Sequence, residues 1–311
     1  MKRIFLLFAA AVMSVGIASA QDINKAIEAA NNGNEAFQMG EYDLAVEAFK
    51  NSLAIAEGLG EQGAEHAGTC KTAICNIYLA HAKNLIKTAD FDGALAKLNE
   101  TIATSEGYGA ADTAEDAKGL IPQVYMQKGN TALKAKDMAS AIEAYAKVVE
   151  LNPNNGDAYL RLGRAYAATG KIDEAVAAYE TAAANGEEAD AKKQLSTLFL
   201  KRAQASLKAG KNQEVIDNAL KANSYLENAN AYKLAASAAQ KLKNNAQCIE
   251  FYEKYLQIKP DAKDANGVTF TIAALYQQAG NKAKAIENYE KVASDPQYGA
   301  GAQEQLKVLK Q

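Results

Sequence analysis

The sequence is poor in the residues that most often carry catalysis and ligand stacking. It contains no tryptophan, and its only histidines are His66 and His81. It also lacks a glycine-rich phosphate loop, a serine nucleophile elbow and a His-Glu-x-x-His motif. Its many carboxylates fall on the solvent-facing stripes of the helices we predict, where they serve solubility. We therefore predict that the chain is not an enzyme and needs no cofactor.

Cysteine is also scarce, with three residues in the whole chain. Cys70 and Cys75 lie between His66 and His81, a set of soft ligands that suggests zinc. On a helix, however, Cys75 would point nearly opposite to His66 and Cys70. His81 would lie about 22 Å along the axis from His66. These side chains cannot converge on one ion, so we predict no metal site.

Long apolar runs are absent after residue 20, which argues against a membrane span in the body of the chain. The first residues read MKRIFLLFAAAVMSVGIASA, with a basic start, an apolar run and a small-residue site ending at Ala20. This order is typical of a secretory signal peptide cleaved before Gln21, since the run is short for a membrane anchor. The leader is bacterial in style. We expect residues 1–20 to be removed and the mature protein to be periplasmic or secreted.

The chain also lacks a net positive charge. The chain has 34 Lys and Arg against 37 Asp and Glu, a formal charge of −3. Loss of Lys2 and Arg3 with the leader would change this to −5, by subtraction. General polyanion binders usually carry a net positive charge, so we expect no nucleic acid partner.

The sequence does contain a clear helical pattern. In residues 158–183, AYLRLGRAYAATGKIDEAVAAYETAA, one apolar stripe runs through Tyr159, Leu162 and Tyr166. Gly170 interrupts the pattern as a helix end should, and a second stripe follows. The segment predicts two helices joined by a tight turn, with small residues at Gly163 and Ala175 allowing the helices to approach closely.

The same hairpin recurs along the chain. Its second helix carries an equivalent residue, usually small, at Ala45, Ala94, Ala141, Ala175, Val215, Cys248 and Ala285. Five residues earlier, the predicted turn falls at Gly40, Ala89, Lys136, Gly170, Gly210, Lys243 and Gly280. By subtraction, successive hairpins are 33 to 49 residues apart.

A period near 34 residues with this pattern resembles the tetratricopeptide repeat, over about residues 26–297. The resemblance implies an all-α fold, a right-handed α-solenoid of about seven helical hairpins within residues 21–297. Residues 298–311 resemble the capping helix that such arrays need for solubility. The first two steps exceed the period, with extra residues at 57–69 and 105–119. We expect longer second helices followed by a loop there, or alternatively a rim that contacts a partner.

The resemblance also implies a binding site. In the tetratricopeptide family, the first helix of each hairpin lines a concave groove that holds a protein segment. In this register, Leu79 and Leu160 also face the groove. So do the polar side chains that we predict to bind a partner, namely Lys83, Asn130, Arg164, Lys201, Gln204 and Lys233. The excess of cations there predicts an acidic partner segment.

The kind of partner is indicated in part by the polar residues of the predicted groove. Lys83 and Asn130 resemble the pair with which some family members hold a terminal carboxylate, although the full pattern is absent. The sequence therefore predicts a non-enzymatic scaffold or adaptor of the bacterial envelope that binds a protein segment in a basic groove. The alternative is an accessory protein for carbohydrate or nutrient uptake at the outer membrane. The absence of tryptophan argues against that alternative, because sugar rings stack on exposed aromatic side chains.

Overall fold

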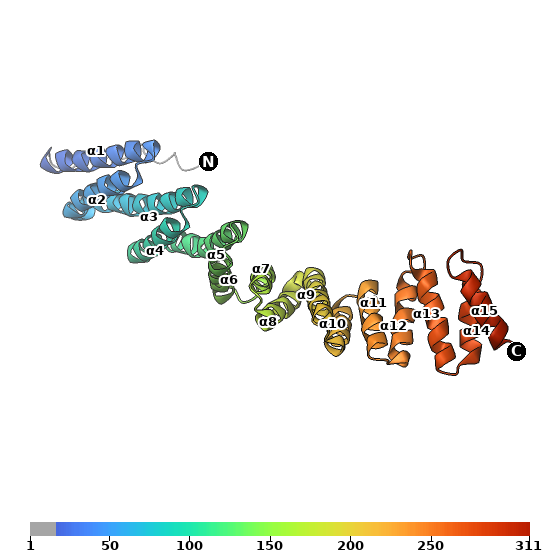
Figure 1. The fold of residues 1–311 in the computed structure, drawn as a ribbon. Helices are drawn as coiled ribbons and strands as arrows, with labels where there is room; N and C mark the ends of the chain where they lie inside the picture. The colour runs from blue at the N-terminus through green and yellow to red at the C-terminus, as the bar shows by residue number, and fades with distance from the viewer. Residues whose placement is uncertain (1–16) are drawn as a thin grey trace. The chain divides into compact units, whose positions relative to one another are not determined.

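The computed structural model describes residues 17–311, which form α-helices connected by short turns and no β-strand (Figure 1). The prediction of an all-α repeat fold is confirmed. Most of the predicted signal peptide, residues 1–16, lies outside the described residues. Residues 17–20 form the start of the first helix, so the expected cleavage point before Gln21 falls inside that helix. From residue 17 onward, no helix combines the length and apolarity needed to cross a bilayer.

The helices group into two compact units, divided between Pro153 and Asn154. The first unit contains α1 (Ile17–Met39), α2 (Tyr42–Gly58), α3 (Ala64–Lys87), α4 (Phe91–Tyr108), α5 (Ala111–Lys134) and α6 (Met138–Leu151). The second contains α7 (Gly156–Ala168), α8 (Ile172–Ala182), α9 (Glu188–Lys208), α10 (Asn212–Tyr225), α11 (Ala229–Lys241), α12 (Asn245–Ile258), α13 (Ala265–Gln278), α14 (Lys282–Lys291) and α15 (Gly299–Leu309). Within each unit, every helix packs mainly on its neighbours in the chain, as expected of a repeat array.

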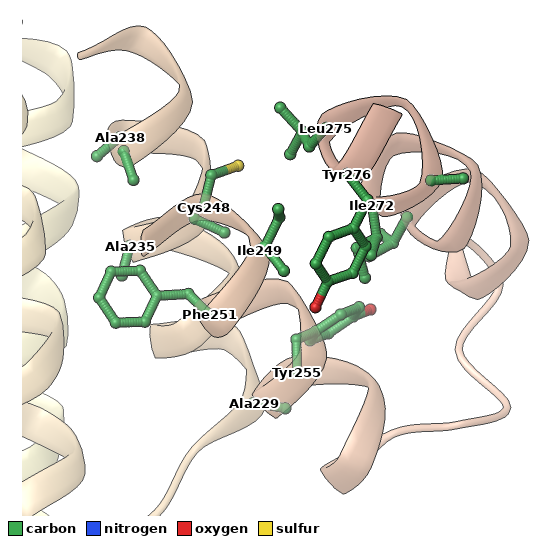
Figure 2. Close-up of a cluster of buried hydrophobic side chains, with 14 of the residues drawn as sticks. Ala229, Ala235, Ala238, Cys248, Ile249, Phe251, Tyr255, Ile272, Leu275 and Tyr276 are labelled. Carbon is green, nitrogen blue, oxygen red and sulfur yellow. The ribbon is translucent and has the colours of Figure 1, made fainter. Parts of the chain in front are cut away.

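The core follows the predicted register. The equivalent position in the second helix is fully buried in all seven hairpins, with 0% exposure at Ala45, Ala94, Ala141, Ala175, Val215, Cys248 and Ala285. Figure 2 shows one stretch of this core, where side chains of α11, α12 and α13 meet around Cys248 and Ile249. Within each unit, a hairpin thus buries its apolar face against the next one.

The hairpin turns also lie where the sequence predicts them. The backbone is left-handed at all seven predicted positions, with φ between +57° and +81° at Gly40, Ala89, Lys136, Gly170, Gly210, Lys243 and Gly280. Side chains also cap the N-termini of several helices by hydrogen bonding to the backbone. For example, the Asp90 carboxylate accepts a hydrogen bond from the Gly93 backbone N–H at 3.0 Å.

Gly163 has a different role from the one expected. We predicted that it would let two helix backbones approach. A Cβ at this position would instead lie 2.7 Å from atoms of the Tyr179 ring, which belongs to the partner helix of the hairpin. The glycine therefore makes room for an aromatic side chain, and Tyr179 is 2% exposed as a result.

The two insertions take a form that the sequence predicted only in part. α2 ends at Gly58 and α4 at Tyr108, and each is followed by only a short connection. Most of the extra residues lengthen the next first helix, so that α3 and α5 each have 24 residues. The expectation of longer second helices is met in part, because α2 and α4 have 17 and 18 residues against 10 to 14 in the other second helices. A short connection stands in place of the expected loop, and most of the added residues extend the helix after it.

Candidate functional site

The first helices of the hairpins form one surface in each unit, which we call the first-helix face. In the first unit it includes α3 and α5, which contact each other directly. In the second unit α7 contacts α9, and α9 contacts α11. All six predicted site residues lie on these helices: Lys83 on α3, Asn130 on α5, Arg164 on α7, Lys201 and Gln204 on α9, and Lys233 on α11.

Two cations of the second unit are available to a partner. Lys201 is exposed on α9 together with Gln204, and Arg164 is half-buried on α7. Neither Arg164 nor Lys201 forms an ion pair with a side chain of the described residues. Arg164 lies near the buried Tyr179, whose pKa is raised by burial to about 12 although the arginine charge lowers it. The guanidinium charge of Arg164 is therefore unmatched.

Lys233 is in a different setting. Its Nζ lies 2.6 Å from Asp264 Oδ2 and 5.5 Å from the centre of the Tyr255 ring. The Tyr255 hydroxyl donates a hydrogen bond to Asp264 Oδ1 at 2.6 Å. Lys233 and Tyr255 together lower the pKa of Asp264, while burial and the bond to Asp264 raise the pKa of Tyr255 to about 12. The charge of Lys233 is therefore largely matched inside the protein.

Lys83 and Asn130 have different surroundings in the first unit. Lys83 lines an open hollow of about 310 Å³ between α3 and α5, and Asn130 is not among the lining residues. The Asn130 carboxamide oxygen instead accepts a hydrogen bond from the Tyr145 hydroxyl at 2.7 Å, which ties α5 to α6. The Asn130 oxygen is thus engaged inside the first unit, and the pairing of Lys83 with Asn130 on a carboxylate stays a prediction.

The sequence register also predicted that two leucines face the groove, but both side chains are buried in the structure. Leu79 is 6% exposed and Leu160 is 3% exposed. Leu160 packs in a cluster with Ala191 and Leu195, which belong to the N-terminal turns of α9. Those turns are extra to the repeat. The step of 40 residues from Ala175 to Val215, by subtraction, was the available signal for them.

One polar cluster was not predicted at all. Lys50 donates a hydrogen bond to the Tyr78 hydroxyl at 3.0 Å, which is the main cause of the raised pKa of Lys50. Lys97 lies over the same ring, 5.3 Å from its centre, and pairs with Glu100 at 2.9 Å and with Asp43 at 3.4 Å. These charges lie mainly on second helices and are matched with one another.

The histidines and cysteines do not converge on one point. Ser52 Oγ lies 2.9 Å from His66 Nε2 and 3.2 Å from Cys70 Sγ, whereas His81 stacks on Tyr42 with ring centres 4.7 Å apart. No group of three or more His, Cys, Asp or Glu side chains within the described part of the chain is arranged to hold a metal ion.

Taken together, the stacked helical hairpins define an all-α repeat protein. Two tetratricopeptide repeat models match the chain, one at residues 132–198 and the other at residues 229–262 and 270–294. The chain therefore contains tetratricopeptide repeats, which typically mediate protein–protein interactions.

Comparison with individual proteins gives partial matches. The chain is 28% identical over 185 residues to the RxLR effector protein SFI4 of Phytophthora infestans (strain T30-4), covering 58% of this chain and 52% of that protein. It is 34% identical to the small glutamine-rich tetratricopeptide repeat-containing protein 2 of Mycosarcoma maydis, covering 17% of this chain and 25% of that protein. The chain thus spans about half of the first relative and a quarter of the second. A crystal structure of MamA protein is 25% identical with a TM-score of 0.33, covering 57% of this chain and 97% of that one.

Proposed function

We propose that this protein is a non-enzymatic scaffold of the bacterial envelope, which binds an acidic segment of a partner protein on the first-helix face of its second unit. The observation that carries the proposal is the pair of unmatched cations, Arg164 on α7 and Lys201 on α9. These helices are neighbouring first helices of an array built from tetratricopeptide repeats.

The charge argument depends on the difference between matched and unmatched groups. The whole chain has a formal charge of −3, so unmatched cations on one face are not a consequence of a basic composition. An acidic segment would pair with Arg164 and Lys201, and Gln204 on the same helix could bond to its backbone. Such complementarity mainly raises the association rate and selects the partner. Lys233 would contribute less, because Asp264 already neutralises it.

The location in the envelope is proposed from the leader sequence. Cleavage before Gln21 would keep α1 from residue 21 onward. The buried residues Ala26, Ala30 and Ala36 of α1 would therefore be retained, and α1 could still pack against α2. The mass of the protein isolated from its host would test this. Retention of Met1 on exported protein would contradict the proposal of a cleaved signal peptide.

The binding proposal is tested by capture and charge reversal. The protein is used as bait with cross-linking in envelope extract, and the association rate of a captured partner is measured. We expect the double variant Arg164→Glu, Lys201→Glu to associate about tenfold or more slowly, since steering depends on these charges. Added salt should also slow the wild type, because exposed charges are screened beyond about 8 Å at physiological ionic strength.

A matched control variant changes the net charge by the same amount at two lysines outside the proposed face. Lys254 on α12 and Lys307 on α15 are exposed and have no ion pair with a described side chain. Lys254→Glu, Lys307→Glu should bind like the wild type. If both double variants slow association equally, the effect is one of total charge and the proposed face is wrong.

A further inference from the structure

An open hollow lies on the first-helix face of the first unit, between α3 and the N-terminal half of α5. It has a volume of about 310 Å³, and its lining residues are Lys83 from α3 and Glu115, Asp116, Gly119, Leu120 and Gln123 from α5. Residues 115–119 belong to the second insertion, which lengthens α5 beyond the repeat. The extra helical turns therefore supply most of the charged wall of this hollow.

Two opposite charges in the hollow are left without partners. The side chains of Lys83 and Asp116 form no ion pair or hydrogen bond with any described residue, although both line the same space. Glu115 differs, because its Oε1 lies 3.0 Å from Lys118 Nζ, which also pairs with Glu106 Oε1 at 2.9 Å. The hollow thus offers one free ammonium group and one free carboxylate.

Gly119 keeps the space between these charges open. Glycine inside a helix costs about 1 kcal/mol relative to alanine, so its presence in α5 needs a reason. Packing does not supply one, since no atom lies within 4 Å of the place where a Cβ would be. Gln123 lies one turn further along, and its Nε2 donates to the Gly119 carbonyl at 3.3 Å, leaving its carboxamide oxygen for a ligand.

We propose that this hollow binds a mixed-charge peptide segment, whose acidic side chain meets Lys83 and whose basic side chain meets Asp116. This rests on the proposed function and specifies the partner chemistry in the first unit. A purely acidic segment would meet Asp116 and Glu115 and be repelled. A protein segment fits better than a free small molecule, because small-molecule sites usually enclose most of the ligand, about 70–90% of its surface, and this hollow is open.

The test uses a displayed library of random twelve-residue peptides selected on the wild-type protein. We expect enriched peptides to carry an acidic and a basic residue at a recurring spacing. The variant Lys83→Glu should select a basic residue at the former acidic position, and Asp116→Lys should select an acidic residue at the former basic one. Peptides selected on the wild type should bind each single variant about three- to tenfold more weakly, the range expected when one exposed ion pair becomes a repulsion.

A steric variant tests the hollow without changing its charge. Gly119→Leu should weaken the same peptides about tenfold by filling the space, an amount typical of a lost contact of this size. Gly68→Leu on α3 is the matched control, because its Cβ position is also open and it does not line the hollow. Both variants should keep the wild-type helical content.

The outcomes separate this inference from the proposed function. Selection that is unaltered by Lys83→Glu, Asp116→Lys and Gly119→Leu would overturn the mixed-charge hollow. If the selection then changes with Arg164→Glu, Lys201→Glu, the proposed function stands and only this inference fails. If the wild type enriches no peptide at all, the mixed-charge hollow fails, and the proposed function is decided separately by capture and charge reversal.

Discussion

At the scale of single residues, each hairpin turn depends on one residue with a left-handed backbone. Four of these positions are glycines, but Ala89, Lys136 and Lys243 have φ of 61°, 62° and 57°. A non-glycine residue in this conformation is strained by about 1–2 kcal/mol, because its Cβ approaches the following carbonyl oxygen. Three of the seven turns therefore retain strain that glycine would remove.

Ala89→Gly should raise the free energy of unfolding by about 0.5–1 kcal/mol, since relief of strain exceeds the added flexibility of the unfolded chain. Ala89 is exposed, so no packing is lost. Thermal and urea unfolding would measure the change. The reverse substitution, Gly170→Ala at φ +77°, should destabilise by a similar amount. Equal stability of Ala89→Gly and the wild type would show that this turn is unstrained.

The turns and the buried small residues could be predicted because their information is local. A helical hairpin needs its small residue and its turn five positions apart, so both are written in one short segment. The setting of Lys233 could not be predicted in this way, because Asp264 lies 31 residues later, by subtraction, and belongs to the next hairpin. Likewise Leu160 looks exposed in its own repeat and is covered by α9. The sequence register therefore placed the predicted site residues on first helices, where the structure has them, without their neighbours being known.

At the scale of helices, the close packing of the two helices in a hairpin limits what each position can hold. Ala175 on α8 is 0% exposed, whereas Ala168 at the end of α7 is exposed. Ala175 also belongs to the cluster that joins α8 to α9, so a larger residue would press on two contacts at once.

Ala175→Leu should lower the free energy of unfolding by about 1–3 kcal/mol, because overpacking forces neighbouring side chains and backbone to move. Ala168→Leu makes the same chemical change at an exposed place and should stay within about 0.5 kcal/mol of the wild type. Urea unfolding compares the two variants. Indistinguishable midpoints would mean that the packing of α7 on α8 described above is wrong.

The Lys233–Asp264 pair joins α11 to the start of α13 and makes stability depend on pH. The folded-state pKa of Asp264 is lowered, chiefly by its bond to Lys233, so this contribution is present above the unfolded value of about 3.9. It is lost as the pH falls through the folded pKa. Because both side chains are partly solvated, we expect Asp264→Asn to cost at most about 1 kcal/mol at pH 7 and almost nothing near pH 2.

Melting temperatures measured from pH 2 to pH 7 would check this expectation. Asp261→Asn is the control, since Asp261 is exposed nearby and has no ion pair with a described side chain. It should leave the pH profile unchanged. A profile for Asp264→Asn that runs parallel to the wild type would show that the pair contributes no pH dependence.

At the scale of the whole molecule, contacts are almost entirely between neighbouring helices in the chain. In such an array, stability is close to a sum of repeat terms and nearest-neighbour terms, so a local defect should open only the repeats around it. Tyr289 on α14 and Phe49 on α2 occupy the same repeat position in different units, and each is 2% exposed. They offer a symmetric test of this property.

Tyr289→Ala should cost about 3–5 kcal/mol locally, the usual range for deleting a buried aromatic ring. The loss also removes the hydrogen bond from the Tyr289 hydroxyl to Gln277 on α13, 2.9 Å long. Hydrogen exchange should therefore speed up in α13, α14 and α15 and stay near the wild-type rate in α1 to α4, since opening propagates only to neighbours. Phe49→Ala should give the opposite pattern, with faster exchange in α1 to α3 and protected helices near the C-terminus.

If either substitution speeds exchange equally along the whole chain, the array unfolds as a single cooperative body. Partner segments bound at α3–α5 and at α7–α9 would then stabilise each other, whereas local opening predicts that the two sites bind independently.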